Sequence, residues 1–421
     1  MGEAFWVGFG LGTSVIALLV GTRFLTTLLS TSEYGKLALA ISLTTMAVQI
    51  GGNPVSQTMI RFYAHWREAG KLSLLVKSLG QTLLRQIGMI LFVCMVVAIS
   101  AHYFDTLPSF YCITIVGLLA VLLLVNRVAF GIEDAARERR FRGVVQGSFE
   151  AGRFLFAIGI ITLLTIHTAE AALSGFLMAA VLAVVFHGLF LGKILKPVRG
   201  ASPVDQPTIM PSDASALKHF QMPLYISNAC IWLVMMSERW TLQHYGNLVD
   251  VGGYAAVYQL AFMPMLLVST FLVLLLEPII YQYAGLDGKT AGASQALRIN
   301  FYLAVVILFV TMIIFIGFLF FHPFIGSLFL GEQFRSYSWL FPWLFLAGGF
   351  FAASQQFLIK LQSELRTGAL ASLWGGVALT AVIAYFFGAK YWQLKGVLTA
   401  VVLVNVMLLM FSIYFSGIKK H

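Results

Sequence analysis

The sequence predicts an all-α protein that crosses a membrane about twelve times. Of its 421 residues, 59% are hydrophobic and only 10% are charged, whereas soluble domains carry roughly 25% charged residues. The apolar stretches are unbroken, as in residues 89–100 and 301–321, whereas the strands of a membrane barrel alternate apolar and polar residues. The composition therefore excludes a soluble enzyme, a secreted disulfide scaffold and a disordered chain.

The expected spans follow from a hydropathy window of about 19 residues. They cover residues 5–29, 36–60, 86–104, 110–131, 144–166, 171–194, 219–243, 252–277, 299–321, 338–360, 367–388 and 395–416. The second span is interrupted by Gly51-Gly52-Asn53-Pro54, and the tenth begins near Pro342. The connections are short, so little of the chain is expected outside the membrane.

The basic residues predict the orientation of these spans. Most of the 27 lysines and arginines fall in alternate loops, such as the one that holds Arg137, Arg139, Arg140 and Arg142. Short loops rich in Lys and Arg stay in the cytoplasm. Both termini are therefore predicted to be cytoplasmic. The net charge of +10 is explained by topology, so no nucleic-acid partner is expected.

The longest polar stretch divides the chain into two expected domains. Residues 196–217 contain four prolines, which favour an extended linker over a helix. This stretch separates an N-terminal six-helix bundle, residues 1–195, from a C-terminal six-helix bundle, residues 218–421. Because six is even, both bundles enter the membrane from the same side, as in transporters built from parallel repeats.

Charged and amide side chains inside the spans mark the candidate site. A charge at mid-membrane costs about 2.5–3.5 kcal/mol and usually faces a bundle interior or an aqueous cavity. Two sets stand out, one of intramembrane charges and one of hydrogen-bonding side chains at helical spacing. The charges are Arg23, Glu150, Arg153, Glu238 and Arg239. The second set is Gln49, Asn53, Gln57 and Arg61, each four residues from the last. A further amide, Asn228, lies eleven residues before Arg239.

These residues are expected to line a hydrophilic cavity between the two bundles. The alternative is that they pair with one another, as Glu150 and Arg153 would at a spacing of three. Arginine binds phosphate and carboxylate oxygens in bidentate geometry, and arginines outnumber carboxylates in the set, so the balance favours an anionic substrate. The sequence holds no metal-ligand spacing and no Walker A motif, so neither a metal nor ATP hydrolysis is expected.

Several segments resemble the Wzx-type polysaccharide flippases. Arg23 to Gly35 (RFLTTLLSTSEYG) is similar to the end of their first span, and Ser237-Glu-Arg239 with Val251 to Ala261 (VGGYAAVYQLA) is similar to their seventh and eighth. Leu330 to Phe334, Leu340 to Leu344, Arg366 to Gly368 and Gly396 to Ala400 resemble later spans. Two departures are Glu238, where Asp is usual, and Gly396-Val397, where Gly-Ala is usual.

The resemblance implies two six-helix halves around a central cavity, the fold of the multidrug/oligosaccharidyl-lipid/polysaccharide exporter superfamily. It implies a flippase, not an enzyme, that moves an undecaprenyl-pyrophosphate-linked oligosaccharide across the bacterial or archaeal inner membrane by alternating access. Arg23 and Arg239 correspond to arginines that recur in the family, whereas Arg61 and Arg153 are inferred from periodicity. Glu150 and Glu238 are the candidates for coupling to H⁺ or Na⁺, and no cofactor is expected.

The expected partners are the lipid-linked oligosaccharide, membrane lipids and other polysaccharide assembly proteins. Two alternatives stay open. A multidrug antiporter on the same scaffold would depend on its carboxylates for cation efflux. A non-transporting scaffold of a polysaccharide synthase complex would depend on its basic cytoplasmic loops and not on the intramembrane arginines.

Overall fold

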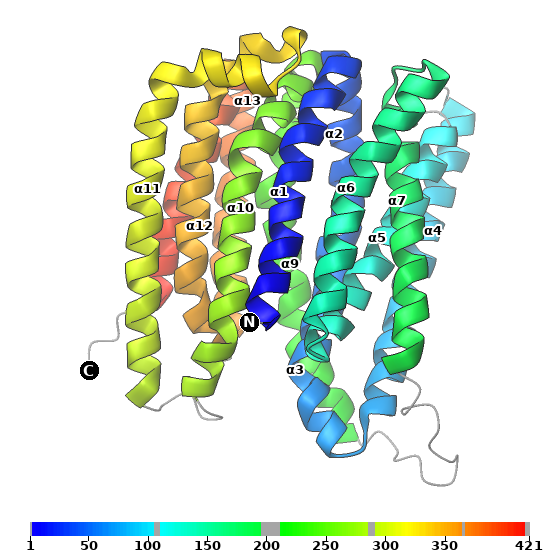
Figure 1. Cartoon of the computed structure of the whole chain (residues 1–421), viewed down its shortest axis with the longest axis vertical. Coiled ribbons are helices and arrows are strands. Elements are labelled where there is room, and N and C mark those ends of the chain that lie inside the picture. The colour runs from blue at the N-terminus through cyan, green and yellow to red at the C-terminus, as the bar shows by residue number, and fades with distance from the viewer. Residues whose placement is uncertain (1, 105–109, 195–210, 285–290, 364–366, 417–421) are drawn as a thin grey trace. The chain divides into compact units, whose positions relative to one another are not determined.

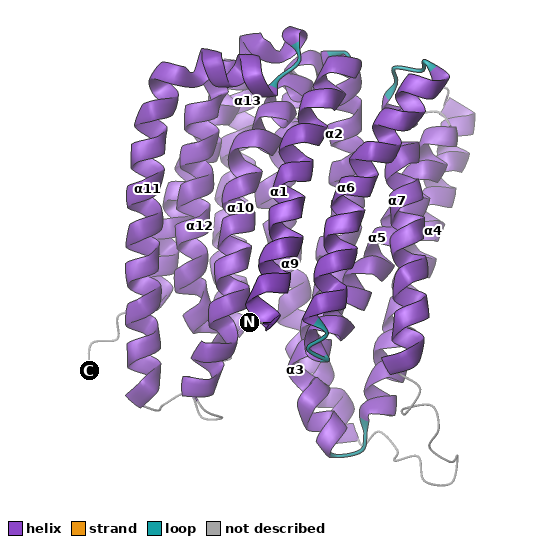
Figure 2. Cartoon of the chain, in the orientation of Figure 1, coloured by secondary structure: helices purple, strands orange, loops and turns teal. Residues whose placement is uncertain are grey.

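The computed structural model describes residues 2–104, 110–194, 211–284, 291–363 and 367–416. Within these ranges every regular element is a helix (Figure 2). In chain order the elements are α1 (Gly2–Leu28), α2 (Thr31–Met46), the π-helix η1 (Ala47–Gly52), α3 (Asn53–Glu68), α4 (Leu72–Phe104), α5 (Phe110–Ala135), α6 (Arg139–Leu164), α7 (Ala169–Ile194), α9 (Pro211–Tyr245), α10 (Leu248–Ala284), α11 (Ala291–Phe329), the 3₁₀ helix η3 (Glu332–Leu340), α12 (Phe341–Ser363) and α13 (Thr367–Ser416).

Eight of the described helices are long and apolar enough to cross a membrane. Two of them are covered least by the rest of the chain: 6% of the apolar window in α4 is buried, and 17% of that in α11. Phe92 on α4 and Phe320 on α11 are 60% and 75% exposed. Exposed apolar surface on this scale is not found on soluble monomers. The count of twelve spans and the cytoplasmic termini stay predictions.

Helix α13 holds two helices and not one. A straight helix of 50 residues would be about 75 Å long, far beyond the roughly 30 Å hydrocarbon core. At Gln393 the backbone leaves the helical region, with φ 47° and ψ −130°. Gly388 and Gly396 then lie backbone to backbone, so that a Cβ on Gly388 would be 2.7 Å from the Gly396 carbonyl oxygen. The chain therefore turns back here, between the two expected spans 367–388 and 395–416.

The helices form two compact units that do not follow chain order. Unit 1 contains residues 1–14 and 40–232, and unit 2 contains residues 15–39 and 233–421. Helices α1, α2 and α9 are each divided between the two units. Of the predicted linker 196–217, residues 196–210 lie outside the described residues, and residues 211–217 form the start of α9.

Unit 1 is built on α5, which packs against α3, α4 and α7, while α6 packs along α7 (Figure 1). Helices α3 and α4 extend past the apolar windows of the sequence, because a cluster of buried side chains joins them to α5. Its buried members are Val55, Met59, Tyr63, Trp66, Leu72, Leu74, Leu75, Leu79, Val128, Ile132 and Leu217. This packing explains why α4 begins at Leu72, well before the expected start at residue 86.

Unit 2 is built on α12, which packs against α10, α11 and α13 (Figure 1). The expected tenth span begins differently: residues 332–340 form η3, and α12 starts at Phe341. Close approaches of glycines bring the remaining parts together. A Cβ on Gly252 of α10 would collide with the Thr31 carbonyl oxygen, and one on Gly331 with that of Thr26. The chain segments around both glycines can approach only because no side chain intervenes.

Candidate functional site

Four polar side chains of unit 1 meet at Asn53, where three helices come together. The Asn53 amide nitrogen donates to Gln49 Oε1 and to Asn228 Oδ1, the latter at 3.2 Å, and Asn53 Oδ1 accepts from Arg127 Nε. Asn228 comes from α9 and Arg127 from α5. We call Gln49, Asn53, Arg127 and Asn228 the Asn53 cluster. The structure thus brings together three of the predicted site residues and adds Arg127, which the sequence places only near the cytoplasmic end of its span.

The Gly-Gly-Asn-Pro sequence explains the local geometry of the Asn53 cluster. Proline has no N–H for the helical bond of its turn, and the chain here widens into the π-helix η1 instead of breaking. Single π-turns within helices are frequent at functional sites. A Cβ on Gly52 would be 3.0 Å from Arg127 Cγ. The absence of that side chain lets Arg127 pass over the helix and reach Asn53.

A second polar contact extends the Asn53 cluster toward α4. Gln86 Nε2 donates to the Tyr225 hydroxyl at 3.0 Å and to the Gly51 carbonyl at 3.3 Å. Both side chains are half-buried. Neither residue stands out in the sequence, because Gln86 lies at the edge of an expected span and Tyr225 lies near the end of another, where tyrosines are common. A polar residue opposite the Gly-Gly pair was the available signal.

Gln57 and Arg61 continue the row of polar side chains along α3. Gln57 is half-buried and Arg61 is exposed. The structure places neither in the Asn53 cluster. Together, the Asn53 cluster and its neighbours offer amide, hydroxyl and guanidinium groups, which suit hydroxyl-rich and anionic ligands.

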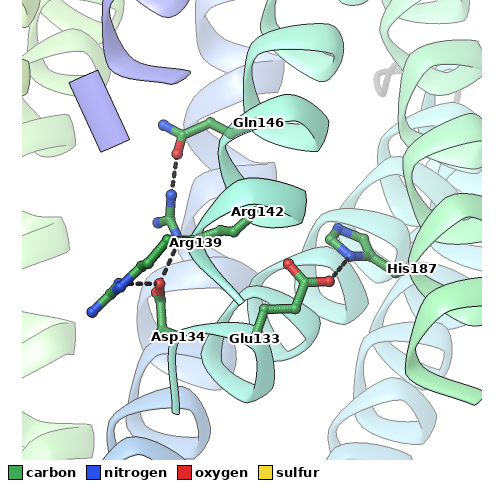
Figure 3. A network of polar contacts seen from close by, with 6 residues as sticks. All are labelled: Glu133, Asp134, Arg139, Arg142, Gln146 and His187. Atoms are coloured by element: carbon green, nitrogen blue, oxygen red, sulfur yellow. Dashed lines mark hydrogen bonds and ion pairs between the residues drawn. The ribbon is translucent and has the colours of Figure 1, made fainter. Parts of the chain in front are cut away.

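The polar residues of α6 pair locally. Arg153 lies 2.7 Å from Glu150, and its guanidinium stacks on Phe154 and Phe176 at 4.8 and 5.5 Å from the ring centres. Gln146, on the same face, accepts a hydrogen bond from Arg142 (Figure 3). The predicted residues Glu150 and Arg153 therefore pair with each other, as the pairing alternative describes.

Glu238 and Arg239 lie side by side in the interior of unit 2, only 1% and 4% exposed. Arg239 Nε is 3.5 Å from Glu238 Oε1, and its guanidinium lies 4.9 Å from the centre of the Tyr258 ring. Neither carboxylate oxygen has a hydrogen-bond partner among the described residues, and the same holds for the Tyr254 hydroxyl and Asn405 Oδ1. Buried polar atoms without partners are costly in a native protein.

These unpartnered oxygens surround a small cavity within unit 2. Its lining combines Glu238, Tyr254, Tyr258, Tyr385 and Asn405 with apolar side chains. It has room for about one water molecule or one small ion. A carboxylate, an amide oxygen and hydroxyl oxygens are ligands that suit a small hard cation or a proton with its water.

Arg23 forms a hydrogen bond at one end of unit 2. Its guanidinium donates to the Leu330 carbonyl, at the end of α11. Three residues further on, Thr26 Oγ1 accepts from the Gly331 N–H at 2.9 Å. The predicted site residue Arg23 thus joins the end of α1 to the segment between α11 and η3.

The 3₁₀ helix η3 of unit 2 makes one more polar contact, with the start of α10. The Tyr337 hydroxyl of η3 donates to Asp250 at 2.9 Å. Partial burial and this carboxylate raise the pKa of Tyr337 to about 12. Among the described residues, we find no group of three His, Cys, Asp or Glu side chains that could hold a metal ion.

No model of a protein family matches the chain, and no curated protein is similar to it in sequence. Solved structures are similar in fold. A variant of the Vibrio cholerae MATE transporter VcmN shares 13% identity at a TM-score of 0.67, over 97% of this chain and 93% of that one. A MOP superfamily transporter from Pyrococcus furiosus shares 14% identity at a TM-score of 0.68, over 98% and 93%.

A multidrug resistance MATE family transporter in an outward-facing conformation shares 13% identity at a TM-score of 0.62, over 97% of this chain and 92% of that one. At such identities the likeness shows the fold. The chain therefore has the fold of MATE transporters of the MOP superfamily, and with its apolar helices it is an integral multi-pass membrane protein. The similar proteins are transporters and not enzymes.

Proposed function

We propose that this protein is a flippase that moves an undecaprenyl-pyrophosphate-linked oligosaccharide across the plasma (inner) membrane by alternating access. The fold supports transport, because the similar solved structures are transporters over nearly the whole chain. The choice of substrate comes from the sequence resemblance and from the chemistry of unit 1. Membrane lipids and other polysaccharide assembly proteins would be its partners.

The observation that carries the substrate class is the Asn53 cluster. A guanidinium and three amides converge there, and the four side chains include no carboxylate. Sugar hydroxyls both donate and accept, as amides do, and a pyrophosphate is the partner that guanidinium groups bind best. Gln86 and Tyr225 would extend the same surface for further sugar hydroxyls.

Glu238 supports a role for ion coupling in unit 2. Its carboxylate is buried without hydrogen-bond partners among the described residues and faces a cavity that fits a small ion. Binding of H⁺ or Na⁺ there would neutralise the carboxylate and reduce the cost of burying its oxygens without hydrogen bonds. In this proposal the ion resets the carrier after the substrate has left. Arg239, beside Glu238 and under Tyr258, holds the carboxylate in place.

The multidrug antiporter is the competing function, because a similar structure is named as a multidrug resistance transporter. A carboxylate beside aromatic rings is also what a cationic drug would need. The cavity at Glu238 is, however, far smaller than the roughly 300–1,000 Å³ of a site for a drug-sized ligand. The polar cluster of unit 1 carries a positive charge, which favours an anion.

Complementation of a deletion strain with Arg127 variants tests the proposed function. Arg127→Lys keeps the positive charge beside Asn53, and Arg127→Gln removes it. We expect Arg127→Lys to restore part of the surface glycan and Arg127→Gln to restore little, at equal amounts of protein in the membrane. Full restoration by Arg127→Gln would show that the charge is not needed for the substrate. Drug resistance that is lost in the deletion strain and restored by both variants would instead favour the antiporter.

A further inference from the structure

A second buried polar group in unit 1 lies outside the Asn53 cluster. Glu133, in the last turn of α5, has its Oε1 2.5 Å from His187 Nδ1 of α7 (Figure 3). The other ring nitrogen, Nε2, lies 2.6 Å from Asn126 Oδ1 on α5. The side chains of Glu133 and His187 are 0% and 2% exposed. Nothing in the proposed transport cycle uses this group.

The orientation of the Asn126 amide sets how many hydrogens the group holds. With the amide oxygen turned toward His187, as in this arrangement, Nε2 carries a hydrogen and donates to it. A further hydrogen must lie between Nδ1 and Glu133 Oε1, since two bare acceptors at 2.5 Å would repel each other. The pair of Glu133 and His187 is then neutral in sum, either as imidazolium and carboxylate or as imidazole and carboxylic acid. It holds one proton more than the ionised form would.

Loss of that proton changes the hydrogen bonding of all three side chains. The imidazole then keeps a single hydrogen, and the favourable place is Nδ1, facing the carboxylate of Glu133. Nε2 becomes an acceptor and faces the acceptor oxygen of Asn126, so the amide must turn and present its NH₂ group. The release of the proton is thereby coupled to a rotation of the Asn126 amide.

The surroundings make both charge states tolerable. Asp134, the next residue of α5, binds two arginines of α6 through one oxygen: Arg139 and Arg142 nitrogens each lie 2.7 Å from its Oδ1 (Figure 3). This network carries one positive charge in excess, which offsets the ionised pair of Glu133 and His187. From α7 the facing group is His187 itself.

Apolar and aromatic contacts close the rest of the surroundings. Phe130 and Phe141 meet the His187 ring edge to face, and α3 meets α5 through Ser56, which touches Gly131. The other carboxylate oxygen of Glu133, Oε2, has no hydrogen-bond partner among the described residues. The group is therefore enclosed mainly by protein, and the exposed residue Arg137 follows it shortly after the end of α5.

We propose that Glu133, His187 and Asn126 form a binding site for one proton, and that this proton is coupled to anion binding at the Asn53 cluster; the second part rests on the proposed function. Arg127 precedes Glu133 by six residues on α5, about 9 Å along the helix. An ionised Glu133 repels an anion held by Arg127, and at a charge separation of about 10 Å and an effective dielectric constant of 20 this repulsion weakens anion binding by about tenfold. The site therefore binds its proton and the anion cooperatively, by the same factor in both directions.

The proton site is tested by NMR of the full chain in nanodiscs with ¹⁵N-labelled histidine. The signals of His187, one of eight histidines, are assigned with His187→Gln. We expect Nε2 of His187 to lose its hydrogen as the pH rises, and we expect this transition to lie at higher proton concentration in Glu133→Gln, where no carboxylate faces the imidazolium. Glu170→Gln, at the other end of α7, is the matched control and leaves the transition in place. An Nε2 signal that is constant while the protein stays folded, or the same transition in Glu133→Gln, would overturn the site.

The coupling is tested with a water-soluble short-chain prenyl pyrophosphate as probe. Wild type is expected to bind it about tenfold more tightly below the His187 transition than above it. Glu133→Gln, in which residue 133 carries no charge, should show that difference reduced to the contribution of the probe's own titration when both pH values lie above the shifted His187 transition. Equal pH dependence in both proteins would overturn the coupling and leave the proton site standing. No binding of the probe at any pH would overturn the coupling together with the proposed function, while the NMR result still decides the proton site.

Discussion

Replacing Asn53 by aspartate tests the electrostatic role of the Asn53 cluster most sharply. The substitution keeps the size of the side chain and an oxygen that can accept from Arg127 Nε. It also places a full negative charge against the guanidinium. At about 4 Å and an effective dielectric constant of 20, the attraction is about 4 kcal/mol. Because both side chains are half-buried, we expect about 1.5–3 kcal/mol of it to remain, as for hydrogen bonds to charged groups.

An anionic ligand would have to compete with that interaction. At 1.4 kcal/mol for each tenfold change, Asn53→Asp should weaken the binding of a short-chain prenyl pyrophosphate roughly 10- to 100-fold. The assay is a titration of the purified protein in nanodiscs at constant ionic strength. Gln333→Glu is the matched control, because it makes the same chemical change at an exposed position of η3 in unit 2. Unchanged binding in Asn53→Asp, or equal weakening in Gln333→Glu, would refute the reasoning.

Three further predictions concern unit 2. Gly252→Ala should lower the free energy of unfolding by about 1–3 kcal/mol, because the added methyl group would collide with backbone atoms. Gly317→Ala, with open space around it, should be neutral or stabilising. Thermal unfolding in detergent compares the two variants, and equal shifts of the melting temperature would contradict the packing. Tyr337→Phe should lower the free energy of unfolding equally at about pH 6 and about pH 9. The pKa of Tyr337 is raised to about 12, so its hydrogen bond to Asp250 contributes to stability in full below about pH 10 and is lost only above it. An effect already lost at about pH 9 would contradict this prediction. Glu238→Gln should reduce the response of substrate transport to H⁺ or Na⁺ gradients below that of the wild type while the protein still folds, and a response equal to that of the wild type would remove Glu238 from ion coupling.

The sequence predicts the helical membrane fold well because apolar runs of this length have few other solutions. It predicts Gln49, Asn53 and Asn228 as site residues for a similar reason: amides repeated at helical spacing share a face, and a lipid-facing row of amides would be costly. The segments that resemble the flippases carry a different kind of information. In the segment Val251 to Ala261, Gly252 is a position where two backbone segments lie in contact, so this segment reflects packing and not substrate.

Other features depend on which helices meet, and periodicity within one helix cannot give that. Arg127 joins the Asn53 cluster only because Gly52 leaves room on a neighbouring helix. His187 looks like a single histidine in an apolar run until α5 and α7 bring Glu133 to it. Arg23, by contrast, is a charged residue within an apolar helix, and its partner is the backbone carbonyl of Leu330, about 300 residues later in the chain. The sequence does not reveal this contact.

Mass spectrometry of lipid extracts from the native host after deletion of this gene, with drug susceptibility measured on the same strain, distinguishes a flippase from an antiporter. If the protein is a flippase, one complete undecaprenyl-linked oligosaccharide accumulates while a surface glycan is lost, and the wild-type gene reverses both. Unchanged glycolipids together with new sensitivity to cationic drugs would contradict this expectation and would identify the protein as an antiporter.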